Sequence, residues 1–139
     1  ASLMDKDPKF GSARLVSGML DFGSGLQASF VCGTQSAAVQ RVHILGTEGR
    51  IEILMPFNAV PENEAVIRVA GQKQPGFGDA REIKFPGCNE YTLQGEAASA
   101  IFAGESPVDY PIEDAIANMQ ILDALARSAK TGSWEMVKS

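Results

Sequence analysis

The 139-residue sequence has few of the residues that carry metal or redox chemistry, with two cysteines and one histidine. Cys32 and Cys88 lie far apart, and two separate thiols are a simpler prediction than a disulfide. Sparse cysteine favours a reducing compartment, so we expect a cytoplasmic location. One histidine and two isolated cysteines do not make up a zinc ligand set, and we predict no metal site.

Long apolar runs and clustered basic residues are also missing. No stretch approaches the ~20 apolar residues that a membrane helix needs. The 12 Lys and Arg residues are scattered, and 17 Asp and Glu residues bring the net charge to -5. Because phosphate backbones and anionic membranes are bound by clustered Lys and Arg, we predict neither a nucleic-acid partner nor a membrane partner.

The sequence holds no complete motif for nucleotide binding or catalysis. In a G-x-G-x-x-G fingerprint, the glycines bring a pyrophosphate to a helix N-terminus. The nearest approach is Gly76-Phe77-Gly78, where Arg81 takes the place of the third glycine. His43 falls inside an apolar strand pattern, which favours a structural or interface role. No two carboxylates can be given acid and base roles from their spacing. We therefore assign no catalytic, cofactor-binding or metal-binding residue.

The first two-thirds of the sequence follows a strand pattern. Leu26, Ala28, Phe30 and Cys32 alternate with other side chains, which is the period of a half-buried strand. Turn signals recur about every ten residues, as in antiparallel sheets. The predicted strands cover residues 13–22, 26–33, 39–45, 50–55, 64–70 and 81–85, with a possible last strand over 133–138.

The last third follows a helical pattern. Asn89 is a plausible N-cap for a helix over 90–103. A second helix starts at Pro111 and stops at Gly132, with acidic residues in its first turn and basic residues in its last. Its predicted buried stripe is Ala115, Met119, Leu122, Ala126 and Ala129. Strands followed by helices predict an α+β fold, a mainly antiparallel open β-sheet with two helices packed on one face.

A second set of apolar side chains alternates with those assigned to the helix side. Two helices can cover only one face, so the second face needs another domain or another copy of the chain. We predict pairing into a homodimer or tetramer through this face. The alternative is that the register bulges and all these side chains share one core. The predicted interface residues are Val16, Leu20, Val31, Val42, Ile44, Leu54 and Val66.

The order of motifs resembles the C-terminal end of the glucose-fructose oxidoreductase, inositol dehydrogenase and rhizopine-catabolism oxidoreductase family (Gfo/Idh/MocA). The resemblance covers nearly the whole chain and includes two turn-and-strand stretches, LDFGSGLQASFVCG and VHILGTEGRIEILMPF. The residues that carry it are Gly46, Thr47, Glu48, Gly49, Pro56, Phe57, Tyr91, Glu96, Gly104, Pro111, Glu113, Asp114, Asn118, Met119, Asp123, Ala124, Ser128, Ala129 and Gly132.

The resemblance implies an enzyme in two parts. Family members carry NAD or NADP on an N-terminal Rossmann domain, act on a hydroxyl or carbonyl of sugars, inositols and related compounds, and pair subunits through the open sheet. Their catalytic Glu-Lys-Pro motif and Asp/His pair have no counterpart here. We therefore expect residues 1–139 to form a single C-terminal α/β domain that walls the substrate site, holds no cofactor, is inactive alone and lacks its Rossmann partner. The alternative is a non-enzymatic binding or assembly module.

Overall fold

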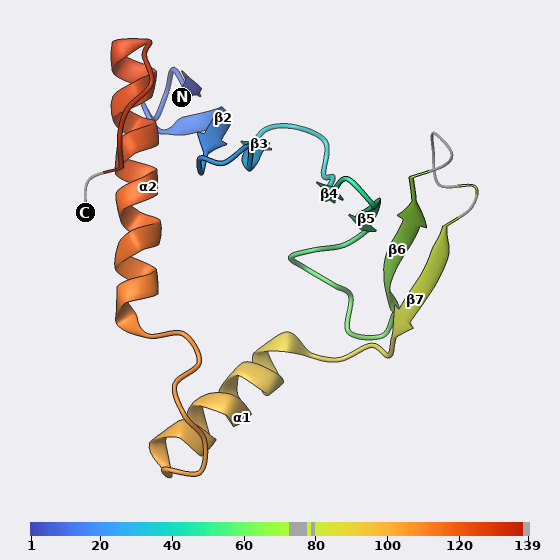
Figure 1. Cartoon of the computed structure of the whole chain (residues 1–139). Coiled ribbons are helices and arrows are strands. Elements are labelled where there is room, and N and C mark those ends of the chain that lie inside the picture. Colours follow the sequence, from blue (N-terminus) through green and yellow to red (C-terminus); the bar gives the residue numbers. More distant parts are fainter. Residues whose placement is uncertain (73–77, 79, 138–139) are drawn as a thin grey trace. The chain divides into compact units, whose positions relative to one another are not determined.

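The chain forms two compact units, in a computed structural model that describes residues 1–72, 78 and 80–137. Unit 1 comprises Ala1–Ala37 and Val108–Ser139, and unit 2 comprises Ala38–Pro107. Two helices accompany a three-stranded and a four-stranded sheet, both antiparallel (Figure 1). The predicted α+β class is confirmed, with the strands divided between two sheets.

The described strands and helices follow the predicted order with two differences. The strand Ser2–Lys6 was not predicted, because its sequence does not alternate apolar and polar residues. The predicted strand 133–138 is wrong over 133–137, which pair with no strand, and residue 138 lies outside the described residues. The elements are β1 (Ser2–Lys6), β2 (Ala13–Asp21), β3 (Gln27–Gly33), β4 (Val42–Leu45), β5 (Gly49–Ile53), β6 (Ala65–Gly71), β7 (Arg81–Phe85), α1 (Glu90–Phe102) and α2 (Ile112–Thr131).

A hydrogen-bonded tie joins β1 to α2 in unit 1. The Ser2 backbone N–H donates to Ser128 Oγ at 2.9 Å, and the Ser2 hydroxyl donates to the Leu125 carbonyl at 2.6 Å. The Ser128 hydroxyl in turn donates to the carbonyl of Ser133, just beyond the helix, at 2.6 Å. Ser128 is only 2% exposed, so each of these polar groups depends on its partner rather than on water.

Close packing of β2 and β3 against α2 depends on a glycine. Gly18 lies opposite Ser2 on β1 and opposite Phe30 on β3. A Cβ at Gly18 would collide with the Phe30 ring and lie 3.3 Å from Leu125 Cδ2. The absent side chain therefore leaves room for the ring and the helix on the same face of the sheet.

The buried stripe of α2 differs from the predicted one. Its buried residues are Ala124, Leu125 and Ser128, whereas Met119 and Leu122 of the predicted stripe are exposed. The prediction followed apolar residues and passed over Ser128, which is buried through its hydrogen bonds. The two predicted helix caps are confirmed. Asn89 Oδ1 accepts from two α1 N–H groups, and Gly132 ends α2 at φ 67°.

The turn after β1 is built on Asp7. Its carboxylate accepts from the backbone N–H groups of Lys9 and Phe10 at 2.8 and 3.0 Å, and from the side-chain amide of Gln35. Because all three bonds favour the charged form, led by the one from Gln35, they lower the pKa of Asp7 below its ordinary value. The carboxylate thereby connects the turn to the segment that follows β3.

The four-stranded sheet of unit 2 has one polar face and one apolar face. His43, Glu52, Arg68 and Glu82 lie opposite one another across the four strands and share the polar face. The register gives most of the other face to aliphatic side chains over all four strands. These are Val42, Ile44, Ile51, Ile53, Ile67, Val69 and Ile83. Arg81, at the start of β7, lies opposite Val69 and therefore shares this face.

The register corrects how the predicted interface residues were grouped. Val16 and Leu20 lie opposite Cys32 and Ala28, on the face of β2 that α2 covers, whereas Val31 lies on the opposite face. The grouping was wrong because a turn between two strands can change which alternate residues face a given side of the sheet. In unit 2, Val42 and Ile44 lie on the apolar face, whereas Leu54 and Val66 lie on the polar face.

The two helices differ in burial. α2 packs against β1, whereas α1 has no buried residue. An isolated helix of this length is marginal in water, so α1 depends on contacts beyond its own hydrogen bonds. Within the described part of the chain, neither helix is long and apolar enough to span a membrane.

We expect Ser128→Ala to lower the free energy of unfolding by about 1–3 kcal/mol, because it leaves the Ser2 N–H and the Ser133 carbonyl without their buried partner. Urea unfolding measures the change. Ser99→Ala is the matched control, because Ser99 lies on the exposed α1 and its hydroxyl donates to the Gly95 carbonyl of the same helix. It should change stability by no more than about 0.5 kcal/mol. Equal losses in the two variants would contradict the role of the tie.

Candidate functional site

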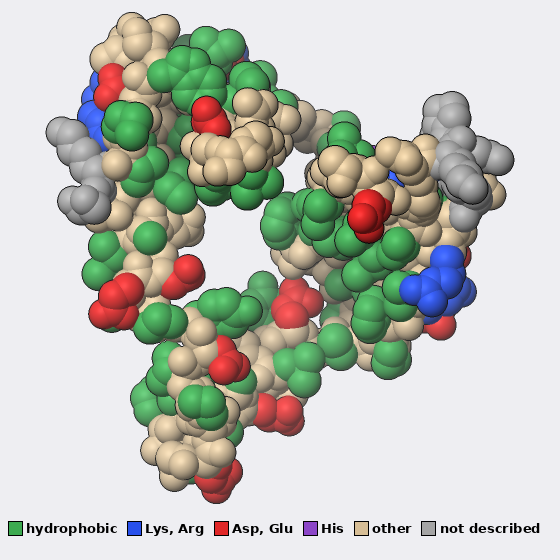
Figure 2. All heavy atoms as spheres, in the orientation of Figure 1, with side chains coloured by type: hydrophobic (Ala, Val, Ile, Leu, Met, Phe, Trp, Pro, Cys, Tyr) green, Lys and Arg blue, Asp and Glu red, His purple; other side chains and the backbone are tan. Residues whose placement is uncertain are grey.

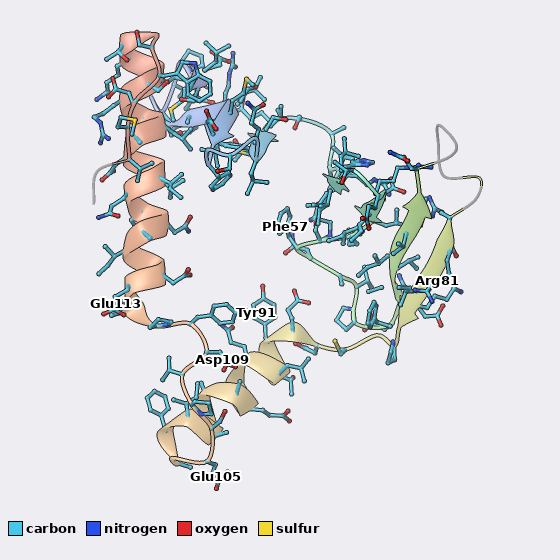
Figure 3. All side chains as sticks on the ribbon, in the orientation of Figure 1. Phe57, Arg81, Tyr91, Glu105, Asp109 and Glu113 are labelled. Atoms are coloured by element: carbon cyan, nitrogen blue, oxygen red, sulfur yellow. The ribbon has the colours of Figure 1, made fainter. Side chains whose placement is uncertain are left out.

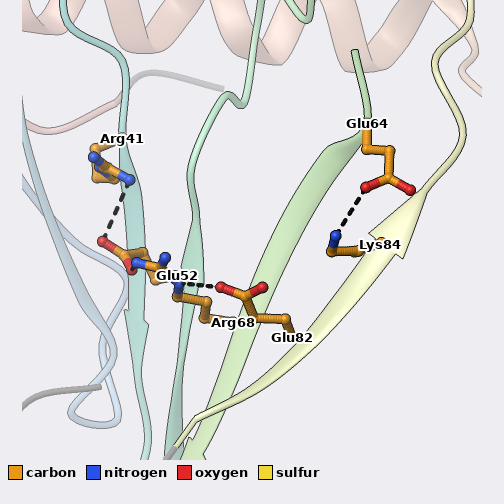
Figure 4. Close-up of polar contacts among 6 residues, drawn as sticks. All are labelled: Arg41, Glu52, Glu64, Arg68, Glu82 and Lys84. Atoms are coloured by element: carbon orange, nitrogen blue, oxygen red, sulfur yellow. Dashed lines mark hydrogen bonds and ion pairs between the residues drawn. The ribbon is translucent and has the colours of Figure 1, made fainter. Parts of the chain in front are cut away.

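The polar face of unit 2 is organised around Glu52, whose side chain is only 10% exposed. One carboxylate oxygen lies 3.5 Å from Arg41 Nη1 (Figure 4), and the other lies 3.4 Å from Arg68 Nη1. The oxygen near Arg41 is also 3.8 Å from His43 Nε2. Cationic side chains thus surround a nearly buried carboxylate, which offsets the cost of removing its charge from water.

Two further ion pairs extend this face over β6 and β7. Arg68 Nε donates to Glu82 at 3.0 Å, and Lys84 Nζ donates to Glu64 at 2.9 Å (Figure 4). The bond to Glu82 is the main cause that raises the pKa of Arg68, and the bond to Glu64 raises the pKa of Lys84. Positive and negative charges alternate across the strands, so the face carries no patch of one sign for an anionic or cationic ligand.

His43 was the histidine for which the sequence favoured a structural or interface role. It lies on β4 directly opposite Glu52, and its side chain is 48% exposed. The carboxylate beside it also contacts Arg41 and Arg68, so it is engaged in an ion-pair network. This arrangement fits a structural role for the cluster better than an acid–base pair aimed at a substrate.

The residues that carry the family resemblance are divided between the units. Phe57 and Tyr91 belong to unit 2, whereas Glu113 belongs to unit 1 (Figure 3). Phe57 and Tyr91 are exposed, and Glu113 lies in the first turn of α2, where the helix dipole favours a negative charge. These residues do not form one local cluster within either unit.

No metal or redox centre is formed by the described residues. Nowhere among them do three His, Cys, Asp or Glu side chains gather at a spacing suited to a metal ion. Cys32 and Cys88 are both free and exposed. The glycines of the incomplete fingerprint, Gly76-Phe77-Gly78, lie outside the described residues except for Gly78.

Unit 1 contains a groove that the sequence did not predict. It has a volume of about 640 Å³ and is formed by the end of β2, by α2 and by the segment after α2. Hydrophobic side chains gather over this unit (Figure 2). The lining residues are Ala1, Met19, Leu20, Asp21, Phe22, Gly23, Ala117, Gln120, Ile121, Ala124, Leu125, Trp134, Glu135, Met136 and Val137. They come from four separate stretches of sequence, so no local motif marks the groove.

Comparison with known sequences finds relatives among oxidoreductases, although no model of a protein family matches the chain. An uncharacterized oxidoreductase, ORF334 of Rhizobium meliloti, is 35% identical over 136 residues, which are 98% of this chain and 41% of that protein. D-xylose 1-dehydrogenase (NADP(+)) 2 of Haloferax volcanii is 30% identical over 122 residues, covering 85% of this chain and 35% of that enzyme. The chain thus spans well under half of each relative.

Solved structures with the same fold include KijD10, a 3-ketoreductase from Actinomadura kijaniata. A mutant of KijD10 in complex with TDP-benzene and NADP matches with a TM-score of 0.76 at 18% identity, over 91% of this chain and 38% of that protein. An open conformation, also with TDP-benzene and NADP, matches with a TM-score of 0.72 over 99% of this chain. At this identity the likeness shows the fold.

We expect Glu52→Gln to lower the free energy of unfolding by about 1–2 kcal/mol, because it removes the charge that Arg41 and Arg68 surround. The loss should shrink at high salt, which screens the remaining charges. Glu64→Gln is the matched control, because Glu64 forms one pair and is 58% exposed. It should change stability by less than about 0.5 kcal/mol. Chemical unfolding that gives the two variants the same stability would contradict the central place of Glu52.

Proposed function

Because the chain belongs to the Gfo/Idh/MocA oxidoreductase family, we propose that it is the C-terminal domain of an NAD(P)-dependent oxidoreductase that acts on a sugar, inositol or related polyol. The observation that carries the proposal is the 35% identity to the oxidoreductase of Rhizobium meliloti over 98% of the chain. The dehydrogenase of Haloferax volcanii supports both the substrate class and a nicotinamide cofactor. NADP in the KijD10 complexes agrees with that cofactor.

The described residues of this chain do not fit a dinucleotide. A pyrophosphate site needs a glycine whose backbone lies open where a strand turns into a helix. β7 leads into α1 through Gly87, but a Cβ there would collide with the Pro61 and Asn63 carbonyl oxygens. Gly87 is thus packed against a loop and is closed to a phosphate. We assign cofactor binding to the remainder of the full-length protein, and substrate-wall and assembly roles to this chain.

A binding or assembly module without enzymatic activity is the competing proposal. Two observations are compatible with this proposal. Glu52 is held in ion pairs with Arg41 and Arg68, and the residues that carry the family resemblance are divided between the two units. The natural coding region decides between the two proposals. A Rossmann unit with a G-x-G-x-x-G turn encoded in the same reading frame supports the enzyme, and its absence supports the module.

We expect the protein expressed from its whole natural reading frame to reduce NADP+ or NAD+ in the presence of an aldose or inositol. Absorbance of the reduced nicotinamide measures the reaction. The 139-residue chain alone should give no reaction and no heat on titration with NADP+, because its described residues form no phosphate cradle. A full-length protein inactive on sugars and inositols, or micromolar binding of NADP+ by the 139-residue chain, would contradict the assignment.

We also propose that the apolar face of unit 2 pairs with a second copy of the chain. The support is the run of aliphatic side chains over β4 to β7, among which Ile44 is 51% exposed. The cores of protein interfaces are depleted in charge. On this face Arg81 lies at the start of the edge strand β7, whereas Glu52, Arg68 and Glu82 share the opposite face. Of the seven residues predicted for an interface, Val42 and Ile44 lie on the face proposed here.

Ile44→Glu should weaken self-association by about tenfold or more, because it introduces a charge among the aliphatic side chains of the proposed interface. Leu45→Glu is the matched control, because the adjacent side chain lies on the opposite face and is 77% exposed. Sedimentation equilibrium should show a dimer or tetramer for the unaltered chain and for Leu45→Glu, with a shift toward monomer for Ile44→Glu. An unaltered chain that stays monomeric at high concentration would contradict the proposal.

A further inference from the structure

Unit 2 contains a smaller cavity, which we call the unit 2 pocket. It is formed mainly by the loop after β5 (residues 54–64) and by the segment that joins β7 to α1 (residues 86–89). Its volume is about 210 Å³. Pockets for drug-sized ligands measure roughly 300–1,000 Å³. The unit 2 pocket is therefore suited to one small molecule, or to one ring of a larger molecule.

Both walls of the unit 2 pocket are held by contacts within unit 2. Gln40 Oε1 accepts from the backbone N–H groups of Phe57 and of the next residue, at 3.2 and 3.1 Å, and so holds the loop that carries the Phe57 ring (Figure 3). On the other wall, a Cβ at Gly87 would collide with the carbonyl oxygens of Pro61 and Asn63. The two walls therefore pack directly against each other.

Two polar side chains of the pocket are available to a ligand. The Asn63 backbone N–H donates to the Val60 carbonyl at 2.9 Å, but the Asn63 side-chain amide has no partner among the described residues. Glu90 is half-buried in the first turn of α1, and in the described part of the chain its carboxylate forms neither a hydrogen bond nor an ion pair. An amide both donates and accepts, and a carboxylate accepts, so the pair suits a ligand with hydroxyl groups.

The same pocket offers apolar surface. Met55 and Phe57 line it together with Asn63 and Glu90. The ring of a sugar or an inositol presents both kinds of group, because its C–H groups are apolar and its hydroxyls donate and accept hydrogen bonds. An aromatic ring contacts C–H groups with its apolar face, while amide and carboxylate groups bind hydroxyls. The lining thus combines what recognition of a polyol ring requires.

The charge of the pocket narrows the class of ligand. Glu90 carries the charge of the lining, and no described Lys or Arg side chain contributes to it. A carboxylate accepts hydrogen bonds from neutral hydroxyls, but it repels the phosphate of a sugar phosphate and the carboxylate of a sugar acid. The pocket therefore favours a neutral ligand over an anionic one.

We propose that the unit 2 pocket binds one ring of a neutral polyol, a sugar or an inositol, with Phe57 against its C–H groups and with Asn63 and Glu90 bonded to its hydroxyls. This inference rests on the proposed function, in which the chain contributes to the wall of the substrate site. It deepens that function, because it assigns the contact with the substrate to named residues and excludes sugar phosphates and sugar acids.

The test titrates the 139-residue chain with D-xylose, D-glucose and myo-inositol and follows the Asn63 side-chain amide by two-dimensional NMR. We expect at least one of these neutral polyols to shift this signal in a saturable way. D-glucuronate, which adds a carboxylate to the ring of D-glucose, should bind more weakly than the neutral polyols. No shift with any of the three, or equally tight binding of D-glucuronate, would overturn the inference.

Glu90→Gln should weaken polyol binding about fivefold or more, because a charged acceptor forms the stronger hydrogen bond. Glu62→Gln is the matched control, because Glu62 lies on the same loop as Asn63 but does not line the pocket. It should leave the affinity unchanged. The amide signals of Tyr91 and Thr92, which donate to Asn89, report whether the first turn of α1 is kept in the Glu90 variant. Equal affinities in the two variants would contradict the role of Glu90.

The titration uses no cofactor, so its outcome is distinct from that of the enzyme assay. If no neutral polyol binds the chain while the full-length protein is active, the assignment of the unit 2 pocket alone is wrong. If the chain binds a polyol as expected while the full-length protein is inactive, the pocket stands and the oxidoreductase assignment falls.

Discussion

The tie between Ser2 and α2 is the interaction on which unit 1 depends. It joins the first strand of the chain to its last helix, so the two ends of the sequence must fold together. Ser128 serves both sides of the joint, because it accepts from Ser2 and donates to Ser133.

Limited burial is the second constraint on this molecule. Among the described residues, the buried hydrophobic ones are Ala70, Ala124 and Leu125, whereas many large apolar side chains are exposed. Folding requires apolar burial that offsets the loss of conformational entropy, and exposed apolar faces of this extent are typical of surfaces that contact another protein or domain. The groove, the uncovered α1 and the apolar face of unit 2 are three places where apolar side chains remain exposed. A domain of a larger oxidoreductase, which we propose, accounts for all three.

The sequence predicted those features that depend on neighbours along the chain. Alternation located β3, and the capping residues Asn89 and Gly132 marked the start of α1 and the end of α2. It did not predict features that depend on distant partners. β1 has no alternation and is recognised only by its pairing with β2, and Ser128 is buried by hydrogen bonds that no apolar pattern reveals. The division of the interface residues between faces required the register, and the charged cluster around Glu52 required four strands side by side.

The central claim is that this chain supplies surfaces that the rest of a two-part enzyme covers. Hydrogen–deuterium exchange, compared between the isolated chain and the full-length protein, tests it most directly. The account predicts slower exchange in the full-length protein at Leu20 to Phe22, along the middle of α2 and throughout α1. Identical exchange in the two proteins over these segments would show that nothing covers them, and would contradict the account.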